Sequence, residues 1–319
     1  MNESKQSSSA EKSDSKTIQK TIALHLFVWA GILFLVLFSI IPMSGVIIAF
    51  KDYNIKAGFK GMFTAPWTAN SGFKHFITFV TNRKFSVLVR NTVIISSLKL
   101  LFAFPFAILF AIMVTEVRSN AYKRIVQTAS YLPHFVSWIV VAGIVYAMFS
   151  TNIGVINELL LKLGWIKEPI PLLLEAKYYY LLATASEIWK ETGWSAIIYL
   201  AAIAGIDPAL YESAQVDGAG RLRRIWHITL PGIQGTVAIL LILSVGSLFS
   251  GSFDQAMMLG NDMNRSRSEI LDVFIYQTGL SKQRYSYAAA VGLFQSVISL
   301  ILVILANAGS KKISGSSLF

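Results

Sequence analysis

Three charged side chains, Glu187, Lys190 and Glu191, fall within about one helical turn of an otherwise apolar stretch at residues 178–206. Because an uncompensated charge inside a membrane is costly, such residues either pair with one another or line a polar route across the bilayer. At helical spacing Glu187 can face Lys190 or Glu191, so a satisfied ion pair is one interpretation. A solute path through this segment is the other, and the three residues alone leave both open.

The remaining ionisable residues indicate no catalytic centre. The chain has no cysteine, and its histidines lie far apart without the His-Glu-x-x-His spacing of a metal site. It also lacks a Gly-x-x-x-x-Gly-Lys-Ser/Thr phosphate loop, so any nucleotide must be held by another chain. The net charge of +11 is spread over many loops, which favours contact with anionic lipid over binding of nucleic acid. We therefore assign no catalytic residue, metal ligand or cofactor to this chain.

The composition predicts an all-α, polytopic membrane protein. Of the 319 residues 54% are hydrophobic and 14% are charged, whereas roughly a quarter of a soluble domain is charged. About 20 apolar residues suffice to cross a bilayer. Six stretches meet this requirement, at about 23–50, 91–115, 125–150, 178–204, 232–250 and 286–308. Lys99 is the one charge in the second of them, and we expect it to face a partner helix or to extend to the interface.

A polar loop at residues 207–231 separates two of these stretches. Asp207 and Pro208 form a good helix start, since Asp caps free backbone N–H groups and Pro is favoured at the first helical position. The helix should run to Val216, where Gly218 and Gly220 allow the chain to turn. A second short helix is expected over 221–229. The loop therefore predicts a helix, bend, helix element at the membrane surface.

The spacing within this loop resembles the EAA loop of ABC importer permeases. Glu212, Ala214 and Gly218 are followed after nine residues by Ile228, and Leu230-Pro231 closes the pattern. Ser213 departs from the family, which usually has Ala there, but Ser is nearly as small. The resemblance implies that an ATPase binds this loop and that the coupling residues are Glu212, Ser213, Ala214, Asp217, Gly218, Gly220, Ile228, Leu230 and Pro231.

Motifs outside the loop resemble the branch of this family that imports complex sugars and polysaccharide fragments. They are Pro42-Met43 with residues 48–54, Arg90-Asn91-Thr92, residues 131–138, Ile188-Trp189-Lys190 with Gly193-Trp194, residues 198–203 and residues 290–296. The resemblance implies the type I importer permease fold with six transmembrane helices. It also implies alternating access driven by ATP that a partner hydrolyses.

The resemblance further implies several partners and a location. Similar importers combine two ATPase subunits, which bind ATP and Mg, with two permeases and an extracytoplasmic sugar-binding protein. We expect the second permease to differ from this chain, although one sequence leaves a homodimer open. The expected location is the bacterial cytoplasmic (inner) membrane. Basic residues in the short segments 116–124 and 309–319 favour cytoplasmic termini.

These considerations predict three regions along the chain. Residues 1–22 are rich in Ser, Lys and Glu and are predicted to be a disordered cytoplasmic tail. Residues 23–308 form the permease domain, with the coupling loop at 207–231, and residues 309–319 form a second cytoplasmic tail. The outer segments 51–90, 151–177 and 251–285 are long enough to dock an external protein.

Candidate solute-path residues are the charged cluster with its aromatic neighbours, and as further candidates Tyr131, Trp138 and Gln295. Indole rings stack on sugar faces, and Lys190 could meet an acidic sugar such as a uronate. The candidates are Tyr131, Trp138, Trp189, Lys190, Glu191, Trp194 and Gln295. Aromatic side chains are also enriched at membrane interfaces, so their presence alone does not identify a path.

Two other functional classes remain as alternatives. An ion-coupled secondary transporter would use Glu187 and Glu191 as membrane carboxylates, but it would more often show repeated halves, and no convincing internal repeat is found. A membrane-embedded transferase would need a constellation of His or carboxylate residues, which the spans lack. Neither alternative accounts for the loop at 207–231.

Overall fold

The computed structural model describes residue 21 and residues 24–250, 252–314 and 318, and these residues are mostly helical. The predicted tail at 1–22 lies outside the described residues apart from Thr21.

The chain forms two compact units, Met1–Lys74 and His75–Phe319. The first contains η1 (Val36–Ile40), α2 (Ile41–Met43), η2 (Ser44–Phe50), η3 (Ile55–Ala57) and α3 (Gly58–Thr64). The rest of the chain contains α4 (Lys74–Val80), α5 (Phe85–Leu98), η4 (Lys99–Ala103), α6 (Phe104–Thr115), α7 (Asn120–Tyr131), η5 (Leu132–Phe135), α8 (Trp138–Phe149), α9 (Val155–Lys162), η6 (Ala176–Tyr178), α10 (Tyr179–Ala204), α11 (Pro208–Val216), α12 (Arg221–Arg224), η7 (Ile225–Thr229), α13 (Leu230–Gly232), α14 (Gln234–Gly246), α15 (Phe253–Leu259), α16 (Arg265–Ser268), α17 (Leu271–Tyr276), η8 (Gln277–Ser281) and α18 (Tyr285–Ser314).

The first unit is a long apolar helix followed by a short segment that contains η3 and α3. Helix Leu24–Phe50 is apolar and long enough to cross a membrane. Beyond it the chain folds back, so that Lys51 and Trp67 form an antiparallel bridge. The buried Lys51 ammonium donates to the carbonyl oxygen of Phe63 and lies 5.3 Å from the centre of the Trp67 ring. Through these two contacts Lys51 holds Phe63 of α3 and Trp67 against the end of helix Leu24–Phe50.

The second unit has two helices that are long and apolar enough to cross a membrane, Phe85–Thr115 and Tyr285–Lys312. Three further helix pairs qualify only if each bent pair is counted as one span. They are Asn120–Phe135 with Trp138–Phe149, Ala176–Ala204 with Pro208–Val216, and Arg221–Gly232 with Gln234–Gly246. The described residues thus offer three spanning helices, or up to six with the bent pairs. The second span begins at Phe85, six residues before the predicted start.

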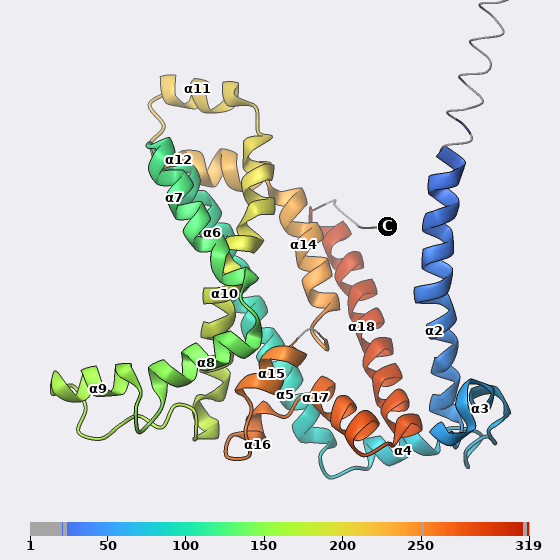
Figure 1. The fold of residues 1–319 in the computed structure, drawn as a ribbon. Coiled ribbons are helices and arrows are strands. Elements are labelled where there is room, and N and C mark those ends of the chain that lie inside the picture. The colour runs from blue at the N-terminus through green and yellow to red at the C-terminus, as the bar shows by residue number, and fades with distance from the viewer. Residues whose placement is uncertain (1–20, 22–23, 251, 315–317, 319) are drawn as a thin grey trace, which may run out of the picture. The chain divides into compact units, whose positions relative to one another are not determined.

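The stretch predicted as one span at 125–150 is not a single helix. Its two halves meet at 103°. Val136 and Ser137 have extended backbone angles at the junction, after a 3-10 turn that has Pro133 near its start. Proline cannot donate a backbone hydrogen bond, so a helix tends to break near it. Figure 1 shows α7 and α8 running in different directions on either side of this break.

Three widened π turns share one local cause. In η1, η4 and η7 the residue after the turn donates its N–H to the carbonyl five residues back. In each case the next residue is a proline, at Pro42, Pro105 and Pro231. Because a proline ring clashes with the carbonyl four residues before it, a wider turn lets the helix continue past that residue.

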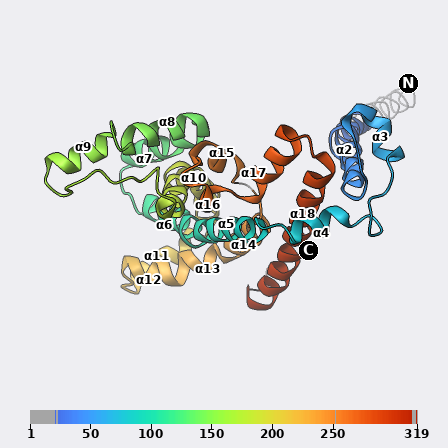
Figure 2. The ribbon, with the colours of Figure 1, turned by 90° about the horizontal axis from the view of Figure 1, so that it is seen from below.

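The core of the second unit lies along α10. Helix α10 packs against α6 and α7, and α14 packs against α18 (Figure 2). One cluster, with Ala111, Ala196, Tyr199 and Ile233 fully or nearly fully buried, joins α6, α10 and the start of α14. Gly193 permits the closest approach, because a Cβ there would overlap the backbone of Ser130 in α7. Small residues at such crossings are typical of membrane helices.

Candidate functional site

The predicted helix, bend, helix element is present at residues 207–232. The Asp207 carboxylate accepts a hydrogen bond of 2.9 Å from the N–H of Ala209, and Pro208 is the first residue of α11. The second arm starts at Arg221 as α12 and continues through the π turn η7 into α13. The predictions of the cap, the first helix and the bend are confirmed. The second arm differs only in its π turn, whose cause is Pro231.

The bend is a glycine-terminated helix end of the Schellman type. The N–H of Ala219 donates to the carbonyl of Ala214 at 2.8 Å, and that of Gly218 donates to Gln215 at 3.1 Å. Gly218 has φ +75°, the left-handed conformation that residues with a Cβ resist. Gly220 has an ordinary extended backbone with open space around it, so local structure does not require glycine there.

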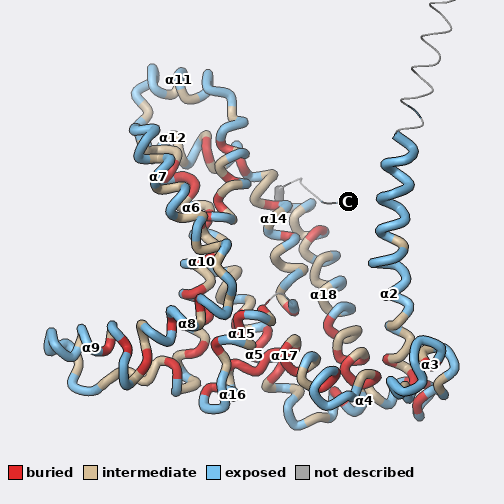
Figure 3. Tube along the Cα trace, in the orientation of Figure 1, coloured by how far each residue is buried: buried red, intermediate tan, exposed pale blue. Residues whose placement is uncertain are grey.

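Few contacts hold α11 to the rest of the unit. The Tyr211 hydroxyl lies 2.9 Å from the hydroxyl of the buried Thr229, which links the two arms of the element. No residue of α11 is buried, and Val216 is 88% exposed. Helix α11 stands away from the other helices of its unit and is coloured as exposed or intermediate along its length (Figures 1 and 3). A nine-residue helix without a buried face is only marginally stable by itself, so a partner surface would stabilise it.

The predicted coupling residues divide into an exposed set and an anchoring set. Glu212, Ser213, Asp217, Gly218, Gly220 and Pro231 are exposed, whereas Ala214, Ile228 and Leu230 are half-buried. Leu230 packs against the core cluster of α6 and α10. The exposed residues are free to contact another protein, and Leu230 connects the element to the apolar helices.

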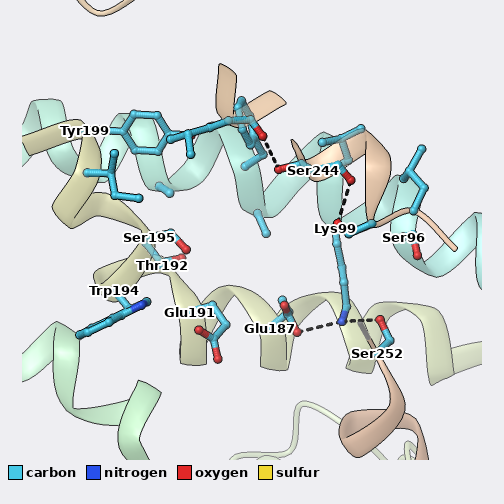
Figure 4. Close-up of a pocket in the computed structure, with 18 of the residues that line it drawn as sticks. Ser96, Lys99, Glu187, Glu191, Thr192, Trp194, Ser195, Tyr199, Ser244 and Ser252 are labelled. Atoms are coloured by element: carbon cyan, nitrogen blue, oxygen red, sulfur yellow. Dashed lines mark hydrogen bonds and ion pairs between the residues drawn. The ribbon is translucent and has the colours of Figure 1, made fainter. Parts of the chain in front are cut away.

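A cavity of about 560 Å³, with a mostly apolar wall that carries several polar side chains, lies among the apolar helices of the second unit (Figure 4). Residues of α5, η4, α6, α10 and α14 and of the segment after α14 line it. Its hydroxyl-bearing serines and threonine are Ser96, Thr192, Ser195, Ser244, Ser247, Ser250 and Ser252. Its volume is within the range of about 300–1,000 Å³ that is typical of ligand sites.

An ion pair lines this cavity. The Lys99 ammonium is 2.9 Å from a carboxylate oxygen of Glu187 and donates to the Ser252 hydroxyl at 3.0 Å (Figure 4). Sequence reasoning expected Glu187 to face Lys190 or Glu191, and the structure corrects this. Lys99 opens the π turn η4 and faces α10, so the expectation that it faces a partner helix is confirmed.

A second polar cluster fixes the break between α7 and α8. Glu191 accepts from Lys190 at 2.9 Å and lies 2.6 Å from the His134 Nδ1. The Lys190 ammonium also donates to the carbonyl of His134 at 2.6 Å, and the His134 ring stacks on Trp194 with 4.3 Å between ring centres. Sequence analysis gave His134 no role, because nothing in the spacing along the chain places it beside α10.

The predicted solute-path residues do not all meet at one place. Glu191 and Trp194 line the larger cavity, and Trp138 and Glu191 line a neighbouring one of about 400 Å³. Tyr131, Trp189, Lys190 and Gln295 line neither. The Gln295 amide instead donates to Asp272 at 2.6 Å and to the carbonyl of Phe249, which links α18 to α17 and to the segment after α14.

Other motif residues from the sequence prove to organise loops. Asn91, in α5, donates to the carbonyls of Ser266 and Glu269 at 3.1 and 3.0 Å and accepts from the Tyr180 hydroxyl at 2.7 Å. The Thr92 hydroxyl accepts from the N–H of Leu271. These contacts hold α16 and α17 against α5. Within the described residues, no group of three or more His, Asp or Glu side chains is placed to bind a metal ion.

Apolar helices of spanning length, a cavity among them and an exposed helix at one end are typical of a polytopic helical membrane transport protein. The family described as the binding-protein-dependent transport system inner membrane component matches residues 103–315. Protein LplB of Bacillus subtilis is 44% identical over 296 residues, which cover 93% of this chain and 91% of that protein. The polygalacturonan/rhamnogalacturonan transport system permease protein YteP of the same organism is 41% identical and covers 93% and 90%.

Chains of solved ABC transporter structures are also similar to this chain. A chain from a bacterial ABC transporter involved in the import of the acidic polysaccharide alginate is 37% identical, with a TM-score of 0.83 and coverage of 94% of this chain and 98% of that one. A chain of the alginate transporter in complex with its alginate pentasaccharide-bound periplasmic protein is 36% identical, also with a TM-score of 0.83, and the match covers 95% and 99%.

This chain therefore belongs to the family of inner membrane components of binding-protein-dependent transport systems. The predicted permease fold and family are confirmed. The alternatives of an ion-coupled secondary transporter and of a membrane enzyme are wrong, because the family is one of transport permeases.

Proposed function

We propose that this chain is one permease of an ATP-driven importer for a complex sugar or oligosaccharide. The likeness to YteP and to the alginate transporter chain, over more than nine-tenths of this sequence, supports a saccharide as the transported solute. The observation that carries the proposal is α11, which is capped at both ends, has no buried residue and is joined to the apolar helices by a short second arm.

In this proposal the element 207–231 couples ATP hydrolysis to the apolar helices. The importer contains two ATPase subunits, which bind ATP and Mg, and one of them docks on α11 of this chain. The exposed Glu212 offers a carboxylate to an Arg or Lys of the ATPase, and the small side chains of Ser213 and Ala214 allow close packing. Movement of α11 reaches the core through Tyr211, Thr229 and Leu230. The helices then alternate between an outward-open and an inward-open arrangement.

The remaining partners follow from the same proposal. A second permease, different from this chain, completes the channel. An extracytoplasmic sugar-binding protein docks at the end of the unit opposite α11, where α15–α17 lie (Figure 1). The complex of a similar chain with a periplasmic protein supports this arrangement. Both termini are then cytoplasmic, on the same side as α11.

Purification of the chain from its native membrane in mild detergent, followed by mass spectrometry, tests the proposal. We expect an ATPase and a second permease to co-purify, and Glu212→Lys to abolish the ATPase association by reversing the charge. Glu168→Lys, the same charge change at an exposed residue between α9 and η6, is the matched control. A folded chain recovered alone in several detergents, or an unchanged association in the Glu212 variant, would contradict the proposed coupling.

A further inference from the structure

We infer that the part of the saccharide held by this chain is an uncharged, hydroxyl-rich sugar unit rather than a uronate. This inference rests on the proposed import of a saccharide and concerns the two adjoining cavities. Both cavities are lined by Glu187, Glu191 and Ser195, so they meet along one row of α10. Trp138 lines one cavity and Trp194 the other, which places an indole ring in each.

Acidic groups outnumber basic ones on these walls. The lining carboxylates are Glu187, Glu191 and Asp254, and Lys99 is the one lining cation among the described residues. Lys99 is already bound by Glu187 at 2.9 Å and by Ser252 at 3.0 Å. No lining cation is therefore left to neutralise a sugar carboxylate.

Lys190 does not supply the missing positive charge on the cavity walls. Its side chain is 6% exposed, and its ammonium is held by Glu191 and by the carbonyl of His134. The Lys190 ammonium therefore offsets part of the negative charge of Glu191, although Lys190 itself does not line either cavity. Asp254 lies at the start of α15, is exposed and forms no ion pair within the described part of the chain. A uronate beside Asp254 would meet a like charge at close range, and like charges at short distance repel each other.

The same walls suit a neutral sugar. A carboxylate accepts hydrogen bonds at both oxygens, so Asp254 and Glu191 can each accept from sugar hydroxyls. The Ser244 and Ser247 hydroxyls donate to backbone carbonyls and can still accept from sugar hydroxyls. An indole ring offers an apolar face to the C–H side of the sugar. Acidic units of a longer saccharide would then have to lie outside these cavities, against the second permease.

Binding of size-matched saccharides tests the inference. The assembled importer in lipid nanodiscs, without its external binding protein, is exposed to equal concentrations of cellotriose and of trigalacturonate. Saturation-transfer nuclear magnetic resonance reports contact with each. We expect signal from cellotriose and at least a tenfold weaker signal from trigalacturonate. Equal or stronger signal from trigalacturonate, or no signal from cellotriose, would overturn the inference.

Two variants test whether Asp254 causes the preference for the neutral saccharide. Asp254→Lys should raise the trigalacturonate signal severalfold, and Asp262→Asn, which removes an 87% exposed carboxylate outside both cavities, should leave the ratio unchanged. An unchanged ratio in the Asp254 variant would overturn the assignment. ATP-driven saccharide uptake with the binding protein present is measured separately. Loss of that uptake would refute the proposed function, whereas intact uptake with the wrong binding ratio would refute only this inference.

Discussion

Replacing Gly218 by alanine perturbs the bend between the two arms of the coupling element without creating a steric clash. A Cβ at this position would meet nothing within 4 Å, so the effect comes from the backbone angle of φ +75° alone. A residue with a Cβ in the left-handed conformation costs roughly 1–2 kcal/mol relative to glycine. Because α11 has no buried residue to resist rearrangement, this strain should open the helix end locally rather than unfold the protein.

The chain contains a matched control for this change. Gly164 ends α9 with the same pattern, in which Trp165 donates to Leu160 and Gly164 donates to Leu161. Its φ is +69°, and a Cβ there would also meet nothing within 4 Å. Gly164→Ala therefore introduces similar strain at a helix end far along the chain from residues 207–231.

The assay compares both variants in the complete importer. A cost of 1–2 kcal/mol corresponds to roughly a 5–30-fold shift in the population of the ordered bend. We expect Gly218→Ala to weaken ATPase association and ATP-driven uptake by up to that factor, and Gly164→Ala to leave both unchanged. Gly218→Asn should be milder, since Asn tolerates this conformation better than Ala. Equal activity of the two alanine variants would refute the argument that the geometry of the bend matters for coupling.

Three further predictions concern the helices and loops. Lys99→Met should lower the stability of the importer by roughly 1–3 kcal/mol, because it leaves the partly buried Glu187 carboxylate without its counter-ion, and adding Glu187→Leu should restore much of the loss. Thermal unfolding of the purified importer measures both, and equal loss in the single and double variants would exclude the ion-pair explanation. Gly193→Ala should destabilise by roughly 1–3 kcal/mol, since the new methyl group overlaps Ser130. Asn157→Ala should increase protease cleavage around residues 150–170, because its side chain bonds the backbone of both ends of this loop, and an unchanged cleavage pattern would show that the loop holds by other contacts.

The features that sequence reasoning predicted well are those with local causes. Asp207, Pro208 and Gly218 specify a cap, a start and an end within a few residues, so the element at 207–231 could be predicted before the structure was known. The long charge-free stretches likewise predicted where apolar helices occur. In both cases the relevant interactions lie within the same segment of chain.

The features that were missed depend on segments distant in sequence. Glu187 of α10 is paired by Lys99 of η4, and Glu191 of α10 is contacted by His134 of η5. The break itself has a proline signal, but a single Pro133 within an apolar stretch does not reveal a bend of 103°. The cavity serines carry no pattern of their own, because they come from three helices and a loop.

The three π turns before prolines determine where single residues can be inserted into or deleted from the apolar helices. A π turn holds one more residue than a turn of α-helix, so a one-residue deletion within it can restore regular winding and leave both flanking segments on their present faces. The same deletion elsewhere in the helix would rotate everything beyond it by about 100° relative to its neighbours. Single-residue insertions and deletions within apolar helices of related chains are therefore expected to concentrate at positions equivalent to 36–40, 99–103 and 225–229, and to accompany loss or gain of the proline that follows.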